Sequence, residues 1–287
     1  MAFAVLPGAW LDRLGKRWQA LIHHPLCLET GLDPARALSL RPASARPWRG
    51  RNWLSSPAGR RGATLTARFA VPADKILLAP PGVTRYRRSA PRTPPMILTV
   101  GAISPRKNFD GLVTALDAVR DLPWTATIVG SDAHSPETGA ALRAQVAALG
   151  LTDRVHLPGA LTGPALETAY AEASFYVHAA HYEGFGMALA DALASGLPTV
   201  ASIGGAVGDW LPEGAALRAT PDAATLAENM RLLLTDSDLA ERLAAAGRAI
   251  DFPTWLGAPL RLRGLGHERL FRRLARSARP RRCGRAG

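Results

Sequence analysis

The second half of the chain alternates short apolar runs with stretches of helical spacing. Apolar residues cluster in five runs that indicate buried strands: 96–103, 125–129, 155–157, 175–182 and 198–202. Good helix formers fill the intervals, for example 140–149 and 165–173. Strands that alternate with helices form parallel sheets covered by helices. The pattern therefore predicts a doubly wound α/β domain.

Two alanine- and leucine-rich helices, predicted over 223–234 and 237–249, complete this domain. Ahead of it, residues 80–95 contain five prolines and Gly82, a composition typical of a connection between domains. The part of the chain before this connection is only about half as long as a usual domain. We therefore expect one complete domain and part of another.

The most informative polar residues follow the run 175–182. Glu183 begins the sequence Glu-Gly-Phe-Gly, and a helix is predicted over 187–194. The two glycines let the backbone approach a ligand closely, and the free N–H groups of a first helical turn bind anions. Glu183 can accept hydrogen bonds from sugar hydroxyls. The motif therefore suits a sugar joined to a phosphate.

Asp191 lies one turn beyond Met187 on the same face of this predicted helix. Its carboxylate can accept hydrogen bonds from a ribose diol. A plainer interpretation stays open for the whole motif: a glycine-rich turn into a helix, with an acid that complements the helix dipole.

A pair of cations follows the first apolar run. Arg106 and Lys107 come after the strand predicted over 96–103 and before helical spacing over 109–119. In open parallel sheets ligands bind at the carboxyl ends of strands, and two cations there neutralise a diphosphate leaving group. A lone basic pair is usually a solvated one. Because this pair and Glu183 both follow strands of one predicted sheet, we expect them to face a common cleft.

At these residues the chain resembles a known family. From about residue 96 to residue 250 it is similar to the donor-binding half of a retaining GT-B glycosyltransferase of family 4, the glycosyl transferases of group 1. The signature is an acid, seven residues and a second acid, matched by Glu183 and Asp191, with 104–108 in the place of the phosphate-binding Arg and Lys. The second acid is usually Glu in that family and is Asp in this chain.

The resemblance implies a role for each matching residue. Glu183 contacts the transferred sugar, Arg106 and Lys107 hold the diphosphate, and Asp191 contacts the ribose. The other donor-binding residues lie in the two glycine-containing loops, and the last three of them contribute backbone amides: Gly101, Ser104, Gly184, Phe185, Gly186 and Met187. The resemblance also implies that neither a metal ion nor a cofactor is needed besides the nucleoside diphosphate sugar.

The implied fold is α/β of the GT-B type, with a complete C-terminal Rossmann-like parallel-sheet domain and a partial N-terminal Rossmann-like domain. The expected boundaries are a partial acceptor-side domain over 1–83, a linker over 84–95, a nucleotide-sugar donor-binding domain over 96–250 and a basic tail over 251–287. The short first domain raises the question whether the chain turns over its donor.

Residues 21–31 resemble a segment that lines the acceptor side of the cleft in this family. His23 and His24, in this segment, are therefore candidate catalytic residues together with Glu183. The alternative is that each histidine is a loop residue that caps a strand.

The positive charge of the chain is concentrated in two segments. The formal net charge is +12, but residues 36–61 hold seven Arg and no acid, and 261–287 hold ten Arg and one Glu. Neither segment shows stacking aromatics at a regular spacing, so no nucleic-acid partner is expected. The tail can hold the protein near anionic lipid or can simply be solvated. Out-of-frame reading of a guanine- and cytosine-rich gene is a third hypothesis for such segments.

Composition sets the remaining limits. Cys27 and Cys283 are the only cysteines, so no disulfide framework or metal cluster is indicated. No apolar run approaches the roughly 18 residues of a membrane-spanning helix, and residues 12–18 interrupt the first apolar stretch too early for a signal peptide. The expected location is therefore cytoplasmic, with room for peripheral membrane contact.

The sequence thus predicts a glycosyltransferase that moves a hexose from a nucleoside diphosphate sugar to an unidentified acceptor with retention of configuration. The acceptor is a sugar, a lipid-linked sugar or a small molecule. Two alternatives stay open: a truncated, inactive nucleotide-sugar-binding protein, and a basic protein that binds nucleic acid or a membrane surface. Saturable nucleotide binding without transfer would distinguish the first, and salt-sensitive binding through the tail the second.

Overall fold

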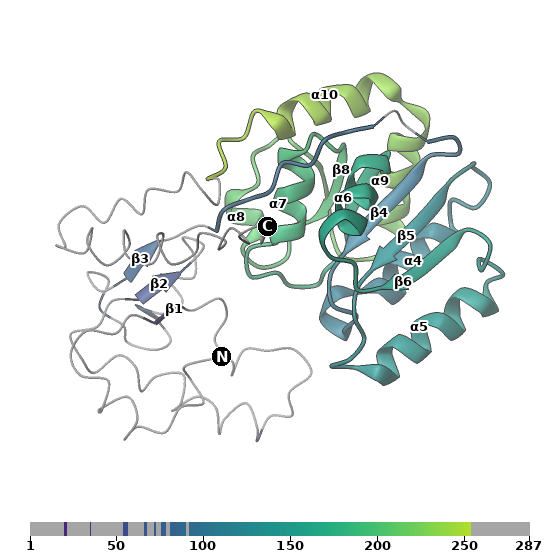
Figure 1. Cartoon of the computed structure of the whole chain (residues 1–287), viewed down its shortest axis with the longest axis horizontal. Coiled ribbons are helices and arrows are strands. Elements are labelled where there is room, and N and C mark those ends of the chain that lie inside the picture. Colours follow the sequence, from purple (N-terminus) through teal and green to yellow (C-terminus); the bar gives the residue numbers. More distant parts are fainter. Residues whose placement is uncertain are drawn as a thin grey trace, which may run out of the picture.

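The computed structural model describes residues 20–21, 35, 54–56, 66–67, 72, 76–78, 81–89 and 92–253. Three short strands precede the main domain: β1 (Ala20–Leu21), β2 (Leu54–Ser56) and β3 (Ile76–Leu78). They pair in parallel in the order β1-β2-β3 (Figure 1). Parallel pairing of consecutive strands is what a partial Rossmann-like domain requires.

The main sheet is parallel and has the strand order β6-β5-β4-β7-β8-β9. Its strands are β4 (Met96–Val100), β5 (Thr125–Val129), β6 (Val155–Gly159), β7 (Phe175–His178), β8 (Thr199–Ser202) and β9 (Leu217–Ala219). The predicted doubly wound sheet is therefore confirmed. The order reverses between β4 and β7, and ligands of such sheets bind beyond the carboxyl ends of the strands at this point.

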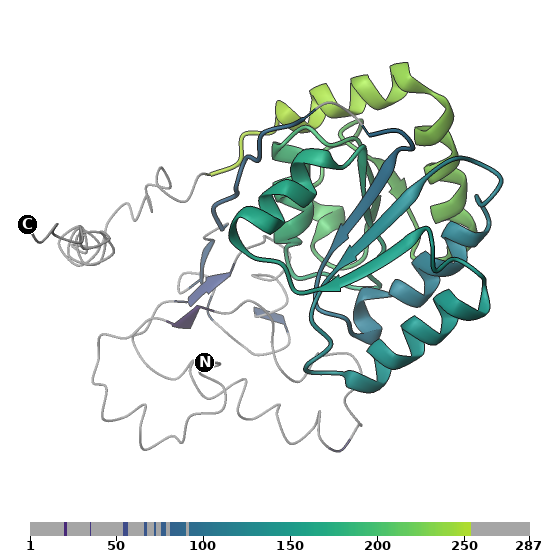
Figure 2. The same ribbon diagram turned by 45° about the vertical axis from the view of Figure 1, so that its right-hand side comes forward.

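Helices cover both faces of the sheet (Figure 2). One core lies under α4 (Phe109–Asp117), α5 (Pro136–Ala148) and α9 (Ala223–Thr235). The other lies under α6 (Gly163–Glu172) and α7 (Met187–Ala194). In β4 the side chain of Ile97 enters the first core, whereas Met96 and Leu98 enter the second. A central strand buried on both faces is continuously apolar, which is why the sequence pattern reveals it.

Two further helices close the domain. The short α8 (Val207–Trp210) follows β8, and α10 (Ser237–Arg248) packs on α7 and α9. The side chain of Asp236 accepts a hydrogen bond from the amide of Leu239 at the start of α10, an N-cap that fixes where the helix begins. None of the helices in the described ranges is both long and apolar enough to cross a membrane.

The structure departs from the sequence pattern in several strands. The run 96–103 was expected to be one strand, but β4 ends at Val100, and β6 extends to Gly159, beyond the predicted 155–157. The run 175–182 was expected to be one strand, but β7 ends at His178. The amide of His181 donates to the carbonyl oxygen of Arg106, outside the sheet, so the strand does not continue. β9 was not predicted, since its three residues include Arg218 and are mostly half-buried. Three residues are too few to show a period.

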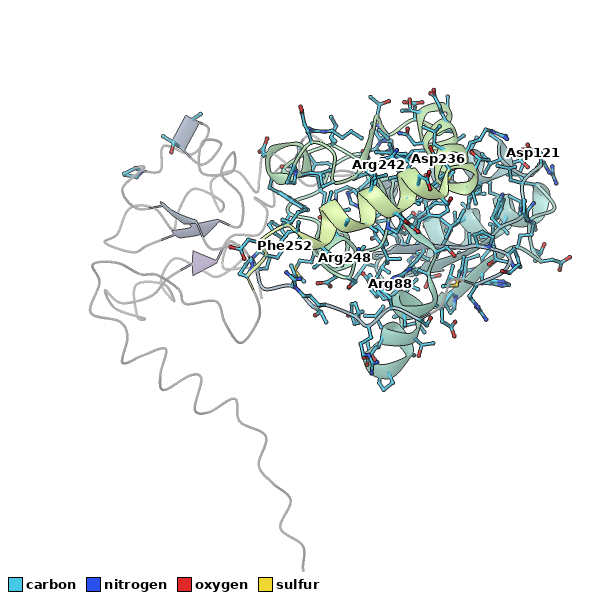
Figure 3. The ribbon with its side chains drawn as sticks, turned by 90° about the horizontal axis from the view of Figure 1, so that it is seen from above. Arg88, Asp121, Asp236, Arg242, Arg248 and Phe252 are labelled. Atoms are coloured by element: carbon cyan, nitrogen blue, oxygen red, sulfur yellow. The ribbon has the colours of Figure 1, made fainter. Side chains whose placement is uncertain are left out.

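Residues 81–89 form a segment that crosses the domain on the way to β4, and we call it the crossing segment. In Figure 1 it is the dark-blue trace that runs beside α7 toward the start of β4. Arg88 Nη1 donates to the carbonyl oxygen of Tyr170 near the end of α6, a place that the helix dipole makes negative. Arg248, in the last turn of α10, lies beside Arg88 (Figure 3). Burial lowers the pKa of Arg88 to about 10, and the charge of Arg248 adds to this effect.

One glycine tests the packing of the strand ends. A Cβ atom at Gly130 would lie 1.9 Å from the carbonyl oxygen of Gly101, which is backbone and cannot turn away. We predict that Gly130→Ala lowers the free energy of unfolding by about 3 kcal/mol in urea titrations. Gly214→Ala is the control: its φ is +78° but nothing lies within 4 Å, so left-handed strain alone should cost about 1 kcal/mol. Equal losses in the two variants would contradict the prediction.

Candidate functional site

Backbone hydrogen bonds join three loops at the carboxyl edge of the sheet. The loop after β7 is bound to the loop after β4, because the His181 amide donates to the Arg106 carbonyl over 3.0 Å. It is also bound to the loop after β8, where the Glu183 amide donates to the Gly204 carbonyl over 3.2 Å and the Ala206 amide donates to the Glu183 carbonyl over 2.9 Å. Glu183 is therefore fixed at the point where the strand order reverses.

Glycines make this junction of loops possible. A Cβ atom at Gly204 would lie 2.1 Å from the carbonyl oxygen of His181. Gly205 has a φ of +75°, and a Cβ atom there would lie 2.4 Å from the carbonyl oxygen of Glu183. A larger residue at either position would separate the β7 and β8 loops.

The predicted acid and cations meet in one cluster. Lys107 Nζ donates a short hydrogen bond to Glu183 Oε2, and Arg106 Nη1 lies 3.6 Å from Glu183 Oε1. Arg106 Nη1 also donates to the carbonyl oxygen of Tyr182 over 2.9 Å. The side chains of Lys107 and Glu183 are only 15% and 13% exposed. These residues were expected to face a common cleft. In the structure Glu183 contacts both cations directly.

Small residues and backbone bonds position the cations. The stem of Lys107 passes over Gly101, where a Cβ atom would lie 3.0 Å from Lys107 Cε. Ser104 precedes the 3-10 helix η6 (Pro105–Lys107), and its carbonyl accepts the Lys107 amide over 3.0 Å. Gly101 and Ser104, both expected to be donor-binding residues, therefore help to position Lys107.

Asn108 holds η6 in place and was missed by sequence reasoning. Its φ of 56° is left-handed, and its Nδ2 donates to the carbonyl oxygens of Ala179 and Pro221 over 3.0 and 2.8 Å. These bonds join the start of α4 to the segments that follow β7 and β9. The only sequence signal is that Asn tolerates left-handed backbone better than most residues.

Burial pushes the pKa of Glu183 upward, but the neighbouring cations outweigh it. Lys107 acts most strongly, His178 and Arg106 add to it, and together they lower the pKa of Glu183 to about 2. Glu183 is therefore ionised at neutral pH and cannot serve as a proton donor.

His178, the last residue of β7, is the second residue that sequence reasoning missed. It is 4% exposed, and its Nε2 has no hydrogen-bond partner among the described residues. Burial lowers its pKa to about 4, with the positive charge of Lys107 as the next cause. The imidazole is therefore neutral beneath the cluster. The available signal was a histidine inside an apolar run.

The Glu-Gly-Phe-Gly turn forms a rigid entry to α7. Gly186 caps the helix with a φ of 85°, and Gly184 donates its amide to Glu183 Oε1 over 3.0 Å. The ring of Phe185 points inward and stacks on Trp210 with centroids 5.2 Å apart, while Trp210 Nε1 donates to the Phe185 carbonyl. Met187 is 46% exposed at the first turn. Trp210 thus holds the Glu-Gly-Phe-Gly turn in place.

Asp191 makes a contact that the sequence did not suggest. Its Oδ1 accepts the amide of Thr84, in the crossing segment, over 2.7 Å. Burial raises the pKa of Asp191 to about 6, although the bond from Thr84 acts in the opposite direction. A further hydrogen-bond donor, such as the ribose hydroxyls expected there, would stabilise the ionised form of the Asp191 carboxylate.

Other parts of the site are placed less closely or not at all. His23 and His24 lie outside the described residues. A groove of about 540 Å³ opens between the first turns of α4 and α5, with Arg106 and His181 at its edge and Phe109 and Leu142 at its floor. Within the described ranges no group of three or more His, Cys, Asp or Glu side chains is arranged to hold a metal ion.

Comparison with known proteins gives consistent matches. Residues 84–250 match the family of glycosyl transferases, group 1. The MMP alpha-(1->4)-mannosyltransferase of Mycolicibacterium hassiacum is 25% identical over 258 residues, which are 85% of this chain and 59% of that protein. The D-inositol 3-phosphate glycosyltransferase of Frankia alni is 30% identical over 222 residues, 69% of this chain and 54% of that protein. The chain spans about half the length of these curated relatives.

The solved sucrose-phosphate synthase of Thermosynechococcus elongatus has the same fold. It superposes with a TM-score of 0.73 at 24% identity, over 94% of this chain and 71% of that one. The predicted GT-B architecture is thereby confirmed.

His178 should make the fold sensitive to acid. Its pKa in the folded chain, about 4, lies below the ordinary 6.5, so the unfolded chain binds more protons between these values and stability falls as pH falls through them. This loss amounts to at most about 3 kcal/mol. We predict that His178→Leu removes that part of the acid dependence in urea titrations. At neutral pH it should match or exceed the original stability, because an unpartnered buried nitrogen is gone.

The matched control is His156→Leu, at an exposed position of β6. It should change neither the acid dependence of stability attributed to His178 nor the stability at neutral pH. The prediction fails if His178→Leu retains the original dependence of stability on pH.

Proposed function

Because this chain belongs to the group 1 glycosyltransferases, we propose that it transfers a hexose from a nucleoside diphosphate sugar to an acceptor hydroxyl with retention of configuration. The acceptor is a sugar, a lipid-linked sugar or a small molecule. Transfer of a hexose is supported by the similarity to the Mycolicibacterium hassiacum relative, which is a mannosyltransferase.

The observation that carries the proposal is the cluster of Glu183, Lys107 and Arg106 at the carboxyl ends of β4 and β7. Its three side chains together carry one excess positive charge in a place from which most water is excluded. The diphosphate of a nucleotide sugar has the opposite charge and can replace Glu183 as the partner of both cations. We infer that a diphosphate oxygen of the donor would take the place that the carboxylate of Glu183 has beside Lys107 and Arg106.

Diphosphate binding then gives each residue its task. Lys107 and Arg106 stabilise the negative charge that develops on the leaving phosphate, together with the amides at the start of α7. Glu183, released from the cations, accepts hydrogen bonds from hydroxyls of the transferred sugar and orients the ring.

Bond changes follow from this arrangement. The bond between the sugar carbon and the phosphate oxygen breaks, and its electron pair stays on the diphosphate. The acceptor oxygen attacks the same face that the diphosphate leaves, and its proton passes to the departing phosphate oxygen. Asp191 binds the ribose, and no metal ion takes part. His23 and His24, which lie outside the described residues, remain proposed catalytic residues together with Glu183.

Loss of a cation should weaken the binding of the nucleotide. We predict that Arg106→Ala and Lys107→Ala each weaken the binding of UDP, GDP or ADP, whichever the chain prefers, by at least about tenfold, because a charge-assisted bond to phosphate is lost. Isothermal titration calorimetry of the full chain measures this. The control is Arg120→Ala, since Arg120 is paired with Asp117 and is 56% exposed. Binding that is unchanged in all three variants would overturn the assignment of the phosphate site.

Removing the charge of Glu183 should separate binding from transfer. We predict that Glu183→Gln binds the free nucleoside diphosphate as tightly as the original chain or up to about tenfold more tightly, because no carboxylate competes for the cations. Transfer or hydrolysis of a labelled GDP-mannose or UDP-glucose donor should fall by at least about 100-fold. A parallel loss of affinity and turnover, or a sugar trapped covalently on Glu183, would contradict the proposed role.

A further inference from the structure

The carboxylate of Asp191 touches the crossing segment at a point far away in the sequence. We propose that Asp191 is a positioning residue that fastens this segment to α7, so that a single carboxylate serves both the connection to β4 and the nucleoside of the donor. The second half of this proposal rests on the proposed function, whereas the first half does not.

The spacing of the contacts fits a helix against an extended strand. Asp191 Oδ1 accepts the Thr84 amide over 2.7 Å, and Ser195 Oγ accepts the Tyr86 amide over 2.8 Å. Four residues of a helix rise about 6 Å, and two residues of an extended chain advance about 6.6 Å. Two acceptors one helical turn apart therefore match alternate amides of the crossing segment. Ser195 Oγ in turn donates to the Asp191 carbonyl over 2.6 Å, which fixes its orientation.

Aromatic stacking and further hydrogen bonds extend the attachment. The ring of Tyr86 stacks on Tyr170 with centroids 4.3 Å apart and 13° between the planes. Tyr170 donates its hydroxyl proton to the carbonyl of Ala188, in α7, over 3.1 Å. Ser89 donates both its amide and its hydroxyl to the Ala171 carbonyl. The crossing segment is thus held at several successive positions, and Asp191 holds the first of them on α7.

A second route leads from the donor loop to the same point. Val83, next to Thr84, donates its amide to the Pro253 carbonyl over 2.8 Å. Phe252 packs edge-on against Trp210 with centroids 5.6 Å apart, and Trp210 stacks on Phe185 of the Glu-Gly-Phe-Gly turn. The start of the crossing segment is therefore held at two places: through Phe252 and Trp210 it is connected to Phe185, and through Thr84 to Asp191 of α7.

The two oxygens of Asp191 are not used equally. The short side chain keeps Oδ1 close to α7, where it accepts the Thr84 amide. Oδ2 accepts no hydrogen bond from the part of the chain that the structure describes. One oxygen is thus used by the crossing segment and the other remains for a ribose hydroxyl. Nucleotide binding through Oδ2 should fix the same carboxylate more firmly on Thr84.

Proline substitution removes the amide without altering α7. Thr84→Pro deletes the donor that Asp191 accepts, and Arg85→Pro is the matched control, because the Arg85 amide makes no hydrogen bond within the described residues. Hydrogen–deuterium exchange of the amides over 86–89 is measured in the full chain. We expect Thr84→Pro to raise their exchange rate at least about tenfold over Arg85→Pro, since local opening sets protection. Equal exchange in the two variants would overturn the attachment.

Variants of the acid test the other partner. Asp191→Ala should raise exchange over 84–89 as Thr84→Pro does, whereas Asp191→Asn should stay within about twofold of the original chain because its amide oxygen still accepts the Thr84 proton. Ser195→Ala should expose Tyr86 while Thr84 stays protected. If Asp191→Ala leaves the protection of Thr84 unchanged, Asp191 does not hold the segment.

Nucleotide addition tests the shared use of Asp191. Saturating GDP or UDP, whichever binds by calorimetry, should slow exchange over 84–89 in the original chain but not in Asp191→Ala. Faster exchange on binding would show that the nucleoside takes the carboxylate away from Thr84, and would overturn sharing. If neither nucleotide binds, the proposed function fails, while the proline and acid variants still decide whether Asp191 anchors the segment.

Discussion

The ion-paired carboxylate of Glu183 is the interaction on which the rest of the site depends. Lys107 and Arg106 would repel each other at the edge of a dense sheet without an anion between them. The carboxylate supplies that anion and keeps the loops after β4 and β7 together while no ligand is present. Because most water is excluded from the cluster, its electrostatic energy depends strongly on the charge between the two cations.

Much of this arrangement follows from local sequence rules, and the remainder does not. Buried strands of a parallel sheet are continuously apolar, so β5 and β8 could be recognised with almost correct ends, and β4 with a correct start. Arg106, Lys107 and Glu183 follow such strands, and parallel strands place their carboxyl ends along one edge. Their direct pairing could not be read from the sequence, because it depends on how far Lys107 reaches over Gly101.

The contacts that were missed join residues far apart in the chain. Asn108 binds Pro221, and Thr84 binds Asp191 across 107 positions. No periodicity within a window of ten or so residues contains such information. His178 was missed for another reason: in the pattern of apolar and polar residues it is a single histidine inside an apolar run. Only the three-dimensional structure shows a neutral ring buried beneath charges.

The glycines at the ends of three neighbouring strands have a consequence for how the site can change. Gly101, Gly130 and Gly159 follow or end β4, β5 and β6, and the Gly130 amide donates to the Gly159 carbonyl over 2.9 Å. At these three positions the chain offers main chain alone, and the stem of Lys107 passes over Gly101. The carbonyl oxygen of Gly101 leaves no room for a side chain at Gly130. Variation at this edge of the sheet therefore has to come from the loops around these glycines.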